Sequence, residues 1–526
     1  MLSLMKWKIS VKASPGVIYV PTDFLTIQEA INNASSGDTI FVHNGTYYEN
    51  LVVNKSVSLV GEYRDFTIIE GNRTGNVINI TVNDVDIMGL TIKESGTNLY
   101  DSGIHVEHSS GNIISQNTIT DNANGISFYS SSNNVVSDNI ILNNYYSGIS
   151  LSYSSSNVVS GNTILNNYYS GISFYSSSNN VVSDNTLQNN YDGISLSSSS
   201  NNVVSGNAIL NNYDGISFYP FSSNNVVSGN TLLNNSNGMY IDSFSSNNTI
   251  YHNNFNNTNQ VSSVATNDWN YGGEGNYWGD YRGQDLNGDG IGDYPYIMDE
   301  NNKDNSPLMG MFHDFAVSLK REIYHVTLIS NSTVSNFRFE IGEETGNEII
   351  LFNVIGEDDS VGFCRIAIPI ELIKYPYIVM VGGEEVVPKL LDILNATQVC
   401  LYFTYLHENN TVTIISSEML LLYNELLDKF LKLQIDLVDL NTTYYDLVKN
   451  YSVLLDNYSQ LQDDYRDLNS SYQEHLSVYS ENVQNLRNLV YIFAATTAIF
   501  LITTIYLSKR AHAIIATKTT VIEDKK

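Results

Sequence analysis

The chain has 526 residues, of which 55 are acidic and 25 are basic, and its formal net charge at pH 7 is −30. A chain of this length implies several domains. The excess of acidic residues argues against binding to nucleic acid, because that binding is dominated by contacts of Lys and Arg with phosphates.

The first 16 residues, MLSLMKWKISVKASPG, lack the continuous apolar run of a secretory signal. Later segments indicate export. We therefore expect that the signal lies upstream of a misassigned start, or that the sequence is a piece of a longer protein.

A short amphipathic helix is predicted in TIQEAINNAS, at 26–35. Thr26 and Glu29 have the spacing of a capping box, and the apolar residues that follow recur at helical spacing. We expect this helix to close the first turn of the repeat region that follows.

Residues 100–260 carry an internal repeat. A Gly followed by an apolar residue recurs every 22 to 23 residues, which is a period typical of solenoids. Apolar and polar residues alternate within each copy, as in strands. Stacking the copies gives two inward columns, Val136, Val159, Val182, Val204, Val227, Ile250 and Ile119, Ile141, Ile164, Leu187, Ile209, Leu232.

An asparagine also keeps its place in successive copies. Asn suits tight turns, and stacked amides bond to one another. The column is Asn117, Asn139, Asn162, Asn185, Asn207, Asn230 and Asn253. We predict a right-handed parallel β-helix over 17–310, with its C-terminal cap at 264–310. A disordered low-complexity tract is the alternative, but disordered repeats need not keep apolar columns in register.

The stretch DFLTIQEAINNASSGDTIFVHNGTYYENLVVNKSVSLVGE, at 23–62, resembles the start of pectin-lyase-type β-helix proteins. The repeats, with GNYWGDYRGQDLNGDGIGDYPY at 275–296 and NNKDNSPL at 301–308, resemble the NosD-type family. That resemblance implies copper handling as one alternative function. Copper favours sulfur or clustered imidazole, whereas His105 and His108 are the only close histidine pair and have no Met cluster beside them.

A polysaccharide-modifying enzyme (lyase, hydrolase or epimerase) is a further alternative on this fold. GTYYE at 45–49 is similar to a motif of pectin methylesterases, but the segment that carries their catalytic Asp is missing. Asp192 and Asp214 share a column that other copies fill with Ser or Asn, so turn residues explain it equally well. We assign no catalytic residue.

Sugar binding is better supported by outward aromatic residues. Tyr side chains flanked by Asn, Asp and Ser can stack on the apolar faces of sugars, although Tyr is also common on β-rich surfaces. The two predicted columns are Tyr129, Tyr175, Tyr219 and Tyr145, Tyr168, Tyr191, Tyr213.

DLNGDGIGD, at 285–293, is the best candidate for a metal site. Oxygen ligands at loop positions 1, 3, 5, 7 and 9 are typical of calcium loops. Here these positions hold Asp285, Asn287, Asp289, the carbonyl of Ile291 and Asp293. Position 12 is Tyr296 in place of the expected Glu, so a Gly-Asp turn without an ion is the alternative.

Residues 312–416 contain several short alternating runs, which predict a small β-sandwich. GFCRIAIP and LYFTYLHENNTVTII resemble a module of archaeal exported proteins. Cys364 and Cys400 both lie in this segment, and either a disulfide or two separate buried thiols would fit. His313, His325 and His407 are interpreted as structural.

Residues 418–487 show spacings of four and three between apolar residues, with mostly Leu at d and aromatics at a. The pattern predicts one long coiled-coil helix and a parallel homo-oligomer; an amphipathic helix packed on the sandwich is the alternative. The residues are Leu426, Phe430, Leu433, Leu437, Leu440, Tyr444, Leu447, Tyr451, Leu454, Tyr458, Leu461, Tyr465, Leu468 and Tyr472.

The segment LVYIFAATTAIFLITTIYL, at 489–507, has no charge and is long enough to span a bilayer. Lys509, Arg510 and Lys518 follow it, so the tail at 508–526 is predicted to be cytoplasmic and the rest extracellular. Sequons such as Asn331 and Asn441 favour an exported glycoprotein. We expect a single-pass cell-surface protein that binds glycans, with a structural surface-layer stalk as an alternative.

Overall fold

The computed structural model describes residues 15–342, 347–391, 397–408, 410–416, 418–455 and 462–523. These residues belong to two units, Met1–Leu420 and Leu421–Lys526. The first unit contains the predicted β-helix and sandwich, and the second unit is helical.

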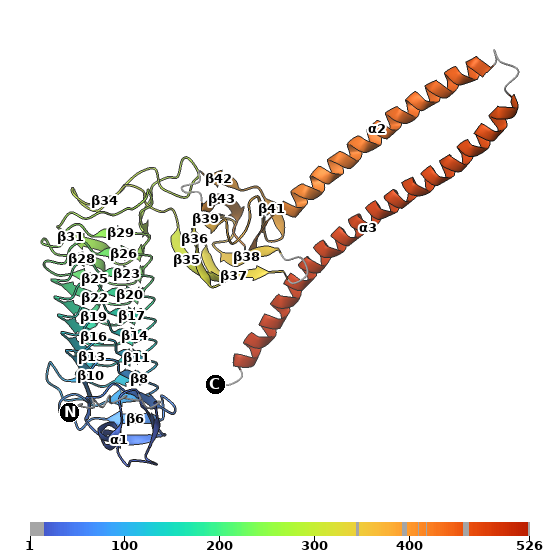
Figure 1. Cartoon of the computed structure of the whole chain (residues 1–526). Helices are drawn as coiled ribbons and strands as arrows, with labels where there is room; N and C mark the ends of the chain where they lie inside the picture. The colour runs from blue at the N-terminus through green and yellow to red at the C-terminus, as the bar shows by residue number, and fades with distance from the viewer. Residues whose placement is uncertain are drawn as a thin grey trace, which may run out of the picture. The chain divides into compact units, whose positions relative to one another are not determined.

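The β-helix is confirmed, with three parallel sheets that run along its length (Figure 1). Each turn of the chain adds one short strand to each sheet. Side chains alternate along each strand, so every second one points inward. We name the sheets A, B and C. The strands of sheets C and A form the two labelled columns of arrows in Figure 1.

Sheet A contains β1 (Val17–Val20), β2 (Thr39–Val42), β5 (Ser58–Gly61), β8 (Asp86–Met88), β11 (Ile113–Ser115), β14 (Val135–Ser137), β17 (Val158–Ser160), β20 (Val181–Ser183), β23 (Val203–Ser205), β26 (Val226–Ser228) and β29 (Thr249–Tyr251). Sheet B contains β3 (Gly45–Tyr48), β6 (Thr67–Glu70), β9 (Thr91–Lys93), β12 (Thr118–Thr120), β15 (Ile140–Leu142), β18 (Thr163–Leu165), β21 (Thr186–Gln188), β24 (Ala208–Leu210), β27 (Thr231–Leu233), β30 (Asn254–Asn256) and β32 (Tyr277–Trp278). Sheet C contains β4 (Leu51–Val53), β7 (Ile78–Ile80), β10 (Ser102–Glu107), β13 (Asn124–Tyr129), β16 (Ile149–Ser152), β19 (Ser170–Tyr175), β22 (Asp192–Ser197), β25 (Asp214–Phe218), β28 (Asn237–Ile241) and β31 (Asn259–Ser263).

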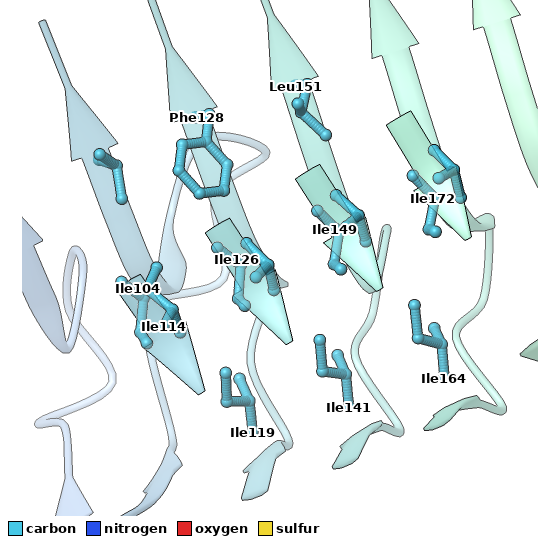
Figure 2. Close-up of a cluster of buried hydrophobic side chains, with 14 of the residues drawn as sticks. Ile104, Ile114, Ile119, Ile126, Phe128, Ile141, Ile149, Leu151, Ile164 and Ile172 are labelled. Atoms are coloured by element: carbon cyan, nitrogen blue, oxygen red, sulfur yellow. The ribbon is translucent and has the colours of Figure 1, made fainter. Parts of the chain in front are cut away.

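The two predicted inward columns form the core. Val182 is fully buried and pairs in register with Val159 on one side and Val204 on the other. Figure 2 shows the second column as a line of Ile119, Ile141 and Ile164 below the isoleucines of sheet C. Because identical side chains repeat at each turn, the core is continuous along the stack.

The predicted asparagine column is a buried amide ladder. Asn139 donates from Nδ2 to Asn162 Oδ1 at 3.0 Å and to the Ile114 carbonyl at 2.8 Å, while its Oδ1 accepts from Asn117. Two further ladders, which the sequence analysis missed, contain Asn112, Asn134, Asn157, Asn180, Asn202, Asn225, Asn248 and Asn122, Asn144, Asn167, Asn190, Asn212, Asn235. Their satisfied amides explain how a repeat poor in aliphatic bulk forms an ordered interior.

The predicted N-terminal helix is α1 (Ile27–Asn33), with Ile27, Ala30 and Ile31 buried. The Thr26 side chain accepts from the Glu29 amide, as the capping box predicts. The remaining amides at this terminus donate to Glu49 instead, from Ile27 at 2.9 Å and from Gln28 at 3.0 Å. A residue of the next turn therefore completes the cap.

The C-terminal cap contains a small hairpin, β33 (Tyr296–Ile297) and β34 (Lys303–Asp304). Asp304 accepts from Trp278 Nε1 at 3.0 Å and from the Asn276 amide at 2.7 Å. Burial raises the pKa of Asp304 to about 6. Trp278 also stacks on Phe255, which follows Leu232 in the inward column of sheet B. This packing covers the end of the core.

The predicted sandwich is present as two five-stranded antiparallel sheets. The first contains β35 (Met311–Leu319), β36 (Glu322–Ser330), β39 (Val361–Pro369), β43 (Gln398–Leu406) and β42 (Lys389–Leu391). The second contains β37 (Thr333–Ile341), β38 (Glu348–Ile355), β44 (Asn410–Ser416), β40 (Tyr377–Val381) and β41 (Glu384–Val386).

A buried ion cluster joins the sandwich to the β-helix. Arg365 of β39 donates to Glu274 at 2.5 Å, and the other oxygen of Glu274 lies 2.7 Å from His252 Nε2. Burial alone would raise the pKa of Glu274, but the hydrogen bond from His252 and the charge of Arg365 lower it to about 2. An apolar cluster of Leu308, Phe312, Ile329 and Phe363 lies at the same junction.

The second unit differs from the single long helix that the sequence predicts. It contains α2 (Glu418–Leu455) and α3 (Gln462–Glu523), and the seam residues Tyr458 and Leu461 lie outside the described residues. The rings of Tyr444 and Tyr472 stack at 5.8 Å, whereas they would be about 42 Å apart in one straight helix. The chain therefore reverses direction between them.

The membrane segment predicted at 489–507 belongs to α3. Within the described residues, one helix is long and apolar enough to cross a bilayer, and its most apolar stretch is not buried in the protein. This agrees with a single C-terminal span.

Candidate functional site

The surface of sheet C brings most of the predicted aromatic residues together. Inward residues such as Ile126 and Phe128 are fully buried, so the serines between them face outward. These serines are in register from turn to turn: Ser127, Ser150 and Ser173 are partly exposed, whereas Ser195 and Ser217 are buried and bonded to Ser170 and Asp192. Tyrosines lie before and after the strands that carry this serine row. We call the serine row and its flanking tyrosines the sheet C surface.

One flanking column contains Tyr145, Tyr168, Tyr191 and Tyr213, as predicted. The rings of Tyr145 and Tyr168 are parallel within 5° at 5.7 Å, and those of Tyr191 and Tyr213 stack at 4.9 Å. All four are exposed, with fractions from 49% to 67%. They form two stacked pairs with flat faces open to solvent.

The other column differs in part from its prediction. Tyr129 and Tyr175 are exposed, and Tyr153 bridges them with edge-to-face contacts of 5.8 and 5.6 Å. Tyr153 is not recognisable from the register of the repeat, because Ser152 occupies the position equivalent to Tyr129 and Tyr175. The motif YSSSN begins at Tyr129, Tyr153 and Tyr175, and this recurrence could have revealed Tyr153.

Tyr219 lies apart from that column. Its side chain is half-buried, and its hydroxyl donates to Asp192 Oδ2 at 3.2 Å. Burial and the neighbouring Asp192 carboxylate raise the pKa of Tyr219 above its ordinary value. Tyr219 is therefore part of a polar cluster and not of an open aromatic face.

That cluster contains two buried carboxylates on adjacent turns, Asp192 and Asp214, which pair in register. Ser217 Oγ lies 2.9 Å from Asp192 Oδ1 and 3.5 Å from Asp214 Oδ2, and Asn237 donates to Asp214 at 2.7 Å. Burial raises the pKa of Asp192 to about 6 and also raises that of Asp214. Carboxyl groups of this kind can donate and accept protons near neutral pH.

The metal loop satisfies its own acceptors in this structure. The Asp285 carboxylate accepts from the amides of Gly288, Asp289 and Gly290, and Asp289 Oδ1 accepts from Ile291. Asp293 accepts from Leu286, and Asn287 donates to Asp289 Oδ2. The Lys389 ammonium donates to the Asn287 carbonyl at 2.7 Å. Among the described residues these carboxylates do not form a group of three or more that could hold an ion. Because a carboxylate has about four acceptor sites, Asp285 could still bind calcium while it accepts the amides, and calcium here is a proposal.

We predict that calcium raises the melting temperature of the detergent-solubilised full chain, and that EDTA reverses this, if the loop binds the ion. Asp289→Ala should abolish the difference between calcium and EDTA, because it removes a ligand. Asp65→Ala, which removes an exposed carboxylate near the N-terminal end of the β-helix, is the control. Equal melting in calcium and EDTA would identify the motif as a turn.

The two cysteines do not form the disulfide that was one of two predictions. Both are free. Cys400 pairs in register with Ala367, three residues beyond Cys364 on the neighbouring strand. Residues an odd number of positions apart along a strand lie on opposite faces of the sheet. The two thiols therefore cannot meet without rebuilding the sheet.

Histidines are not gathered into a metal site. His105 is partly buried and burial lowers its pKa, whereas His108 is exposed and lies against Tyr129. Within the described ranges, no group of three or more His, Cys, Asp or Glu side chains could hold a metal ion.

A cleft of about 1000 Å³ lies beside the Glu274 ion cluster. It is lined by His252, His313 and His325 among other residues, which the sequence separates widely. His313 Nε2 is buried without a hydrogen-bond partner, and burial lowers the pKa of His313 to about 4. The sequence could not reveal this cleft, because it depends on how the sandwich packs on the β-helix cap.

Comparison with known proteins gives a family for the β-helix. A family described as "Periplasmic copper-binding protein (NosD)" matches residues 31–194 and 168–283. The "Probable ABC transporter binding protein NosD" of Stutzerimonas stutzeri is 49% identical over 47 residues. That match covers 9% of this chain and only 11% of the relative.

Solved structures resemble the chain at low sequence identity. The Dettilon tailspike protein is 14% identical, with a TM-score of 0.39 and coverage of 76% of this chain and 93% of its own. An alginate lyase from Paenibacillus sp. str. FPU-7 is 15% identical, with a TM-score of 0.37 and coverage of 48% and 98%. A pectate lyase is 14% identical, with a TM-score of 0.37 and coverage of 49% and 80%. The three-sheet stack of repeats shows a parallel β-helix, and its residues 31–283 are similar to the NosD family.

Proposed function

We propose that the protein is a membrane-anchored surface protein whose sheet C surface binds carbohydrate. The observation that carries this proposal is the pairing of exposed, stacked tyrosines with the partly exposed serines Ser127, Ser150 and Ser173. The stacked rings of Tyr145 and Tyr168 come directly before the strands that carry the partly exposed Ser150 and Ser173. Sugars combine apolar faces with hydroxyl groups, so this surface offers partners to both.

The proposed ligand is a neutral glycan that lies along the stack of turns. Successive turns are about 4.8 Å apart, so the tyrosine columns offer repeated contacts to a repeating polymer. A net charge of −30 would repel a polyanion at low salt. A neutral polymer avoids this repulsion.

We predict that Tyr191→Ala/Tyr213→Ala weakens glycan binding about tenfold, equivalent to about 1.4 kcal/mol. The detergent-solubilised full chain would be screened on a glycan array, and the affinity for the best neutral hit would then be measured by titration. Tyr63→Ala/Tyr100→Ala removes two exposed tyrosines that belong to neither column and should leave binding unchanged. Equal loss in both variants, or no binding by wild type, contradicts the proposal and favours a structural surface-layer role.

A polysaccharide-modifying enzyme is the second candidate, and the pair Asp192 and Asp214 favours it. Both carboxylates are within hydrogen-bond reach of one serine hydroxyl, which has a single hydrogen to donate. Asp192 Oδ1 and Asp214 Oδ2 can therefore be no farther apart than the sum of those two distances, a limit that includes the separation of about 5–5.5 Å in retaining glycosidases. A neighbouring exposed tyrosine pair could hold the chain to be cleaved.

The same pair gives a stability prediction. Asp192 has a folded pKa of about 6, above its ordinary 3.8. The folded state therefore favours the protonated form of Asp192. The stability that this protonated form contributes is complete below about pH 4 and is lost as the pH rises above 6. Asp192→Asn should raise the free energy of unfolding at pH 7 by about 2 kcal/mol, while Asp184→Asn should not.

The outcome separates the two roles of the pair. If the protein is an enzyme, Asp192→Asn releases no new reducing ends from a bound glycan although it is more stable than wild type. If wild type itself releases none from any glycan that it binds, a hydrolase or lyase role of the pair is rejected.

A further inference from the structure

Helix α2 carries a second apolar stripe besides the predicted seam. Leu431, Ile435, Val438 and Tyr445 follow one another at spacings of four, three and seven residues. Leu431 comes one residue after Phe430 of the seam, so this stripe is rotated by about 100° from the seam. The coiled-coil seam alone does not explain why the residues of this second stripe are apolar.

The seam of α2 faces α3 of the same chain. Leu433, Leu437 and Leu440 line a groove together with Tyr479, Val483 and Leu486 of α3. The groove has a volume of about 740 Å³, which is room for about 25 water molecules. Leu433 and Leu440 of the seam remain 62% and 67% exposed. Because protein interiors are close-packed, α2 and α3 of one chain do not complete a core along this groove.

The second stripe lines no part of that groove and lies in water. Its residues have exposed fractions of 48% for Leu431, 63% for Ile435, 64% for Val438 and 67% for Tyr445. An apolar row of this kind on an extracellular helix normally marks an interaction surface. A helix with two apolar stripes has two neighbours, as in a helix bundle, whereas a two-stranded coiled coil needs only the a/d seam.

We propose that the second stripe of α2 is covered by the helical hairpin of a second copy of this chain, so that two hairpins form a four-helix bundle. The second stripe and the groove residues together expose on the order of 1,000 Å² of apolar surface per chain, and a standard stable interface buries about 800 Å² per partner. Anchoring through α3 also holds neighbouring copies in one orientation. This dimer does not depend on the proposed carbohydrate binding.

A lipid surface is a poorer partner for the stripe. Helices that lie on membranes carry Lys and Arg on the polar face, whereas α2 has six acidic residues and three lysines. An acidic helix is repelled by the anionic lipids that such helices usually contact. A second copy avoids this repulsion, because its acidic residues remain in water.

Light scattering on the full chain in mild detergent, corrected for bound detergent, tests the proposal. Wild type at micromolar concentration should have the protein mass of two chains, and Ile435→Asp/Val438→Asp should have the mass of one. Thr443→Asp/Lys432→Gln changes the charge by the same amount on the remaining face of α2 and should keep the mass of two chains. Circular dichroism would verify that helix content is equal in all three.

Other outcomes overturn the proposal. A wild type with the mass of one chain would mean that α2 and α3 close on each other or that lipid covers the stripe. A mass of three or more chains, or loss of the dimer in the charge-matched control, would also reject a two-hairpin bundle that depends on the second stripe.

Discussion

Val182→Asp should destabilise the β-helix by about 4 kcal/mol or more, which is at the extreme of single substitutions. Val182 is fully buried in sheet A between Val159 and Val204. An Asp there has no partner, so it must be buried as an unpaired charge or as an unbonded acid, and both states are costly. Denaturant unfolding of the full chain in detergent would measure the loss.

The neighbouring Val181 provides a matched control. Its side chain is partly exposed on the outer face of the same strand. Val181→Asp makes the same chemical change one residue earlier and should cost less than about 1 kcal/mol, as surface substitutions usually do. Equal destabilisation by both variants would mean that the inward and outward positions are misassigned.

The part of the fold that could be predicted is the part with a local period. Val182 and Asn185 are recognisable because they recur in each copy, and recurrence at a fixed interval places them in one column. The ladders that contain Asn112 and Asn122 were missed although they recur equally. In the sequence these residues resemble asparagines of surface turns. The polarity of a side chain alone does not show whether its amide is buried.

The aromatic site could be predicted only in part. Tyr145 and Tyr168 follow the repeat and lie as expected. Tyr219 instead precedes Pro220, where the repeat sequence changes. The side chain of Tyr219 packs against Asp192. A pattern gives the position of a residue along the strand. The direction of its side chain also depends on neighbours such as Asp192, which another turn supplies.

Contacts between domains had no signal in the sequence. Glu274 and Arg365 are 91 residues apart, and neither lies in a recurring motif. The reversal between α2 and α3 was missed for a related reason, since the heptad spacing continues through 456–461 and a seam does not specify which helix it faces. Both features depend on tertiary packing.

Glu274→Gln should lower the free energy of unfolding by about 3 kcal/mol at pH 7, because removing one partner leaves Arg365 buried without its counter-charge. Arg365 is only 9% exposed, and Glu274 also accepts from His252. As a control, Glu70→Gln disrupts the more exposed Glu70–Lys93 ion pair and should cost at most about 1 kcal/mol. Thermal or denaturant unfolding of the full chain would measure both differences.

The loss of stability in Glu274→Gln should become smaller as the pH falls. The folded pKa of Glu274 is about 2, below its ordinary 4.5. Its contribution to stability is therefore complete above pH 4.5 and is lost as the pH falls towards 2. The difference between wild type and Glu274→Gln should shrink over that range, although Asp192 and Asp304, whose pKa values are raised, change both proteins equally in the opposite sense. A difference that is constant from pH 6 to pH 3 would mean that the Glu274 charge does not hold the sandwich against the β-helix.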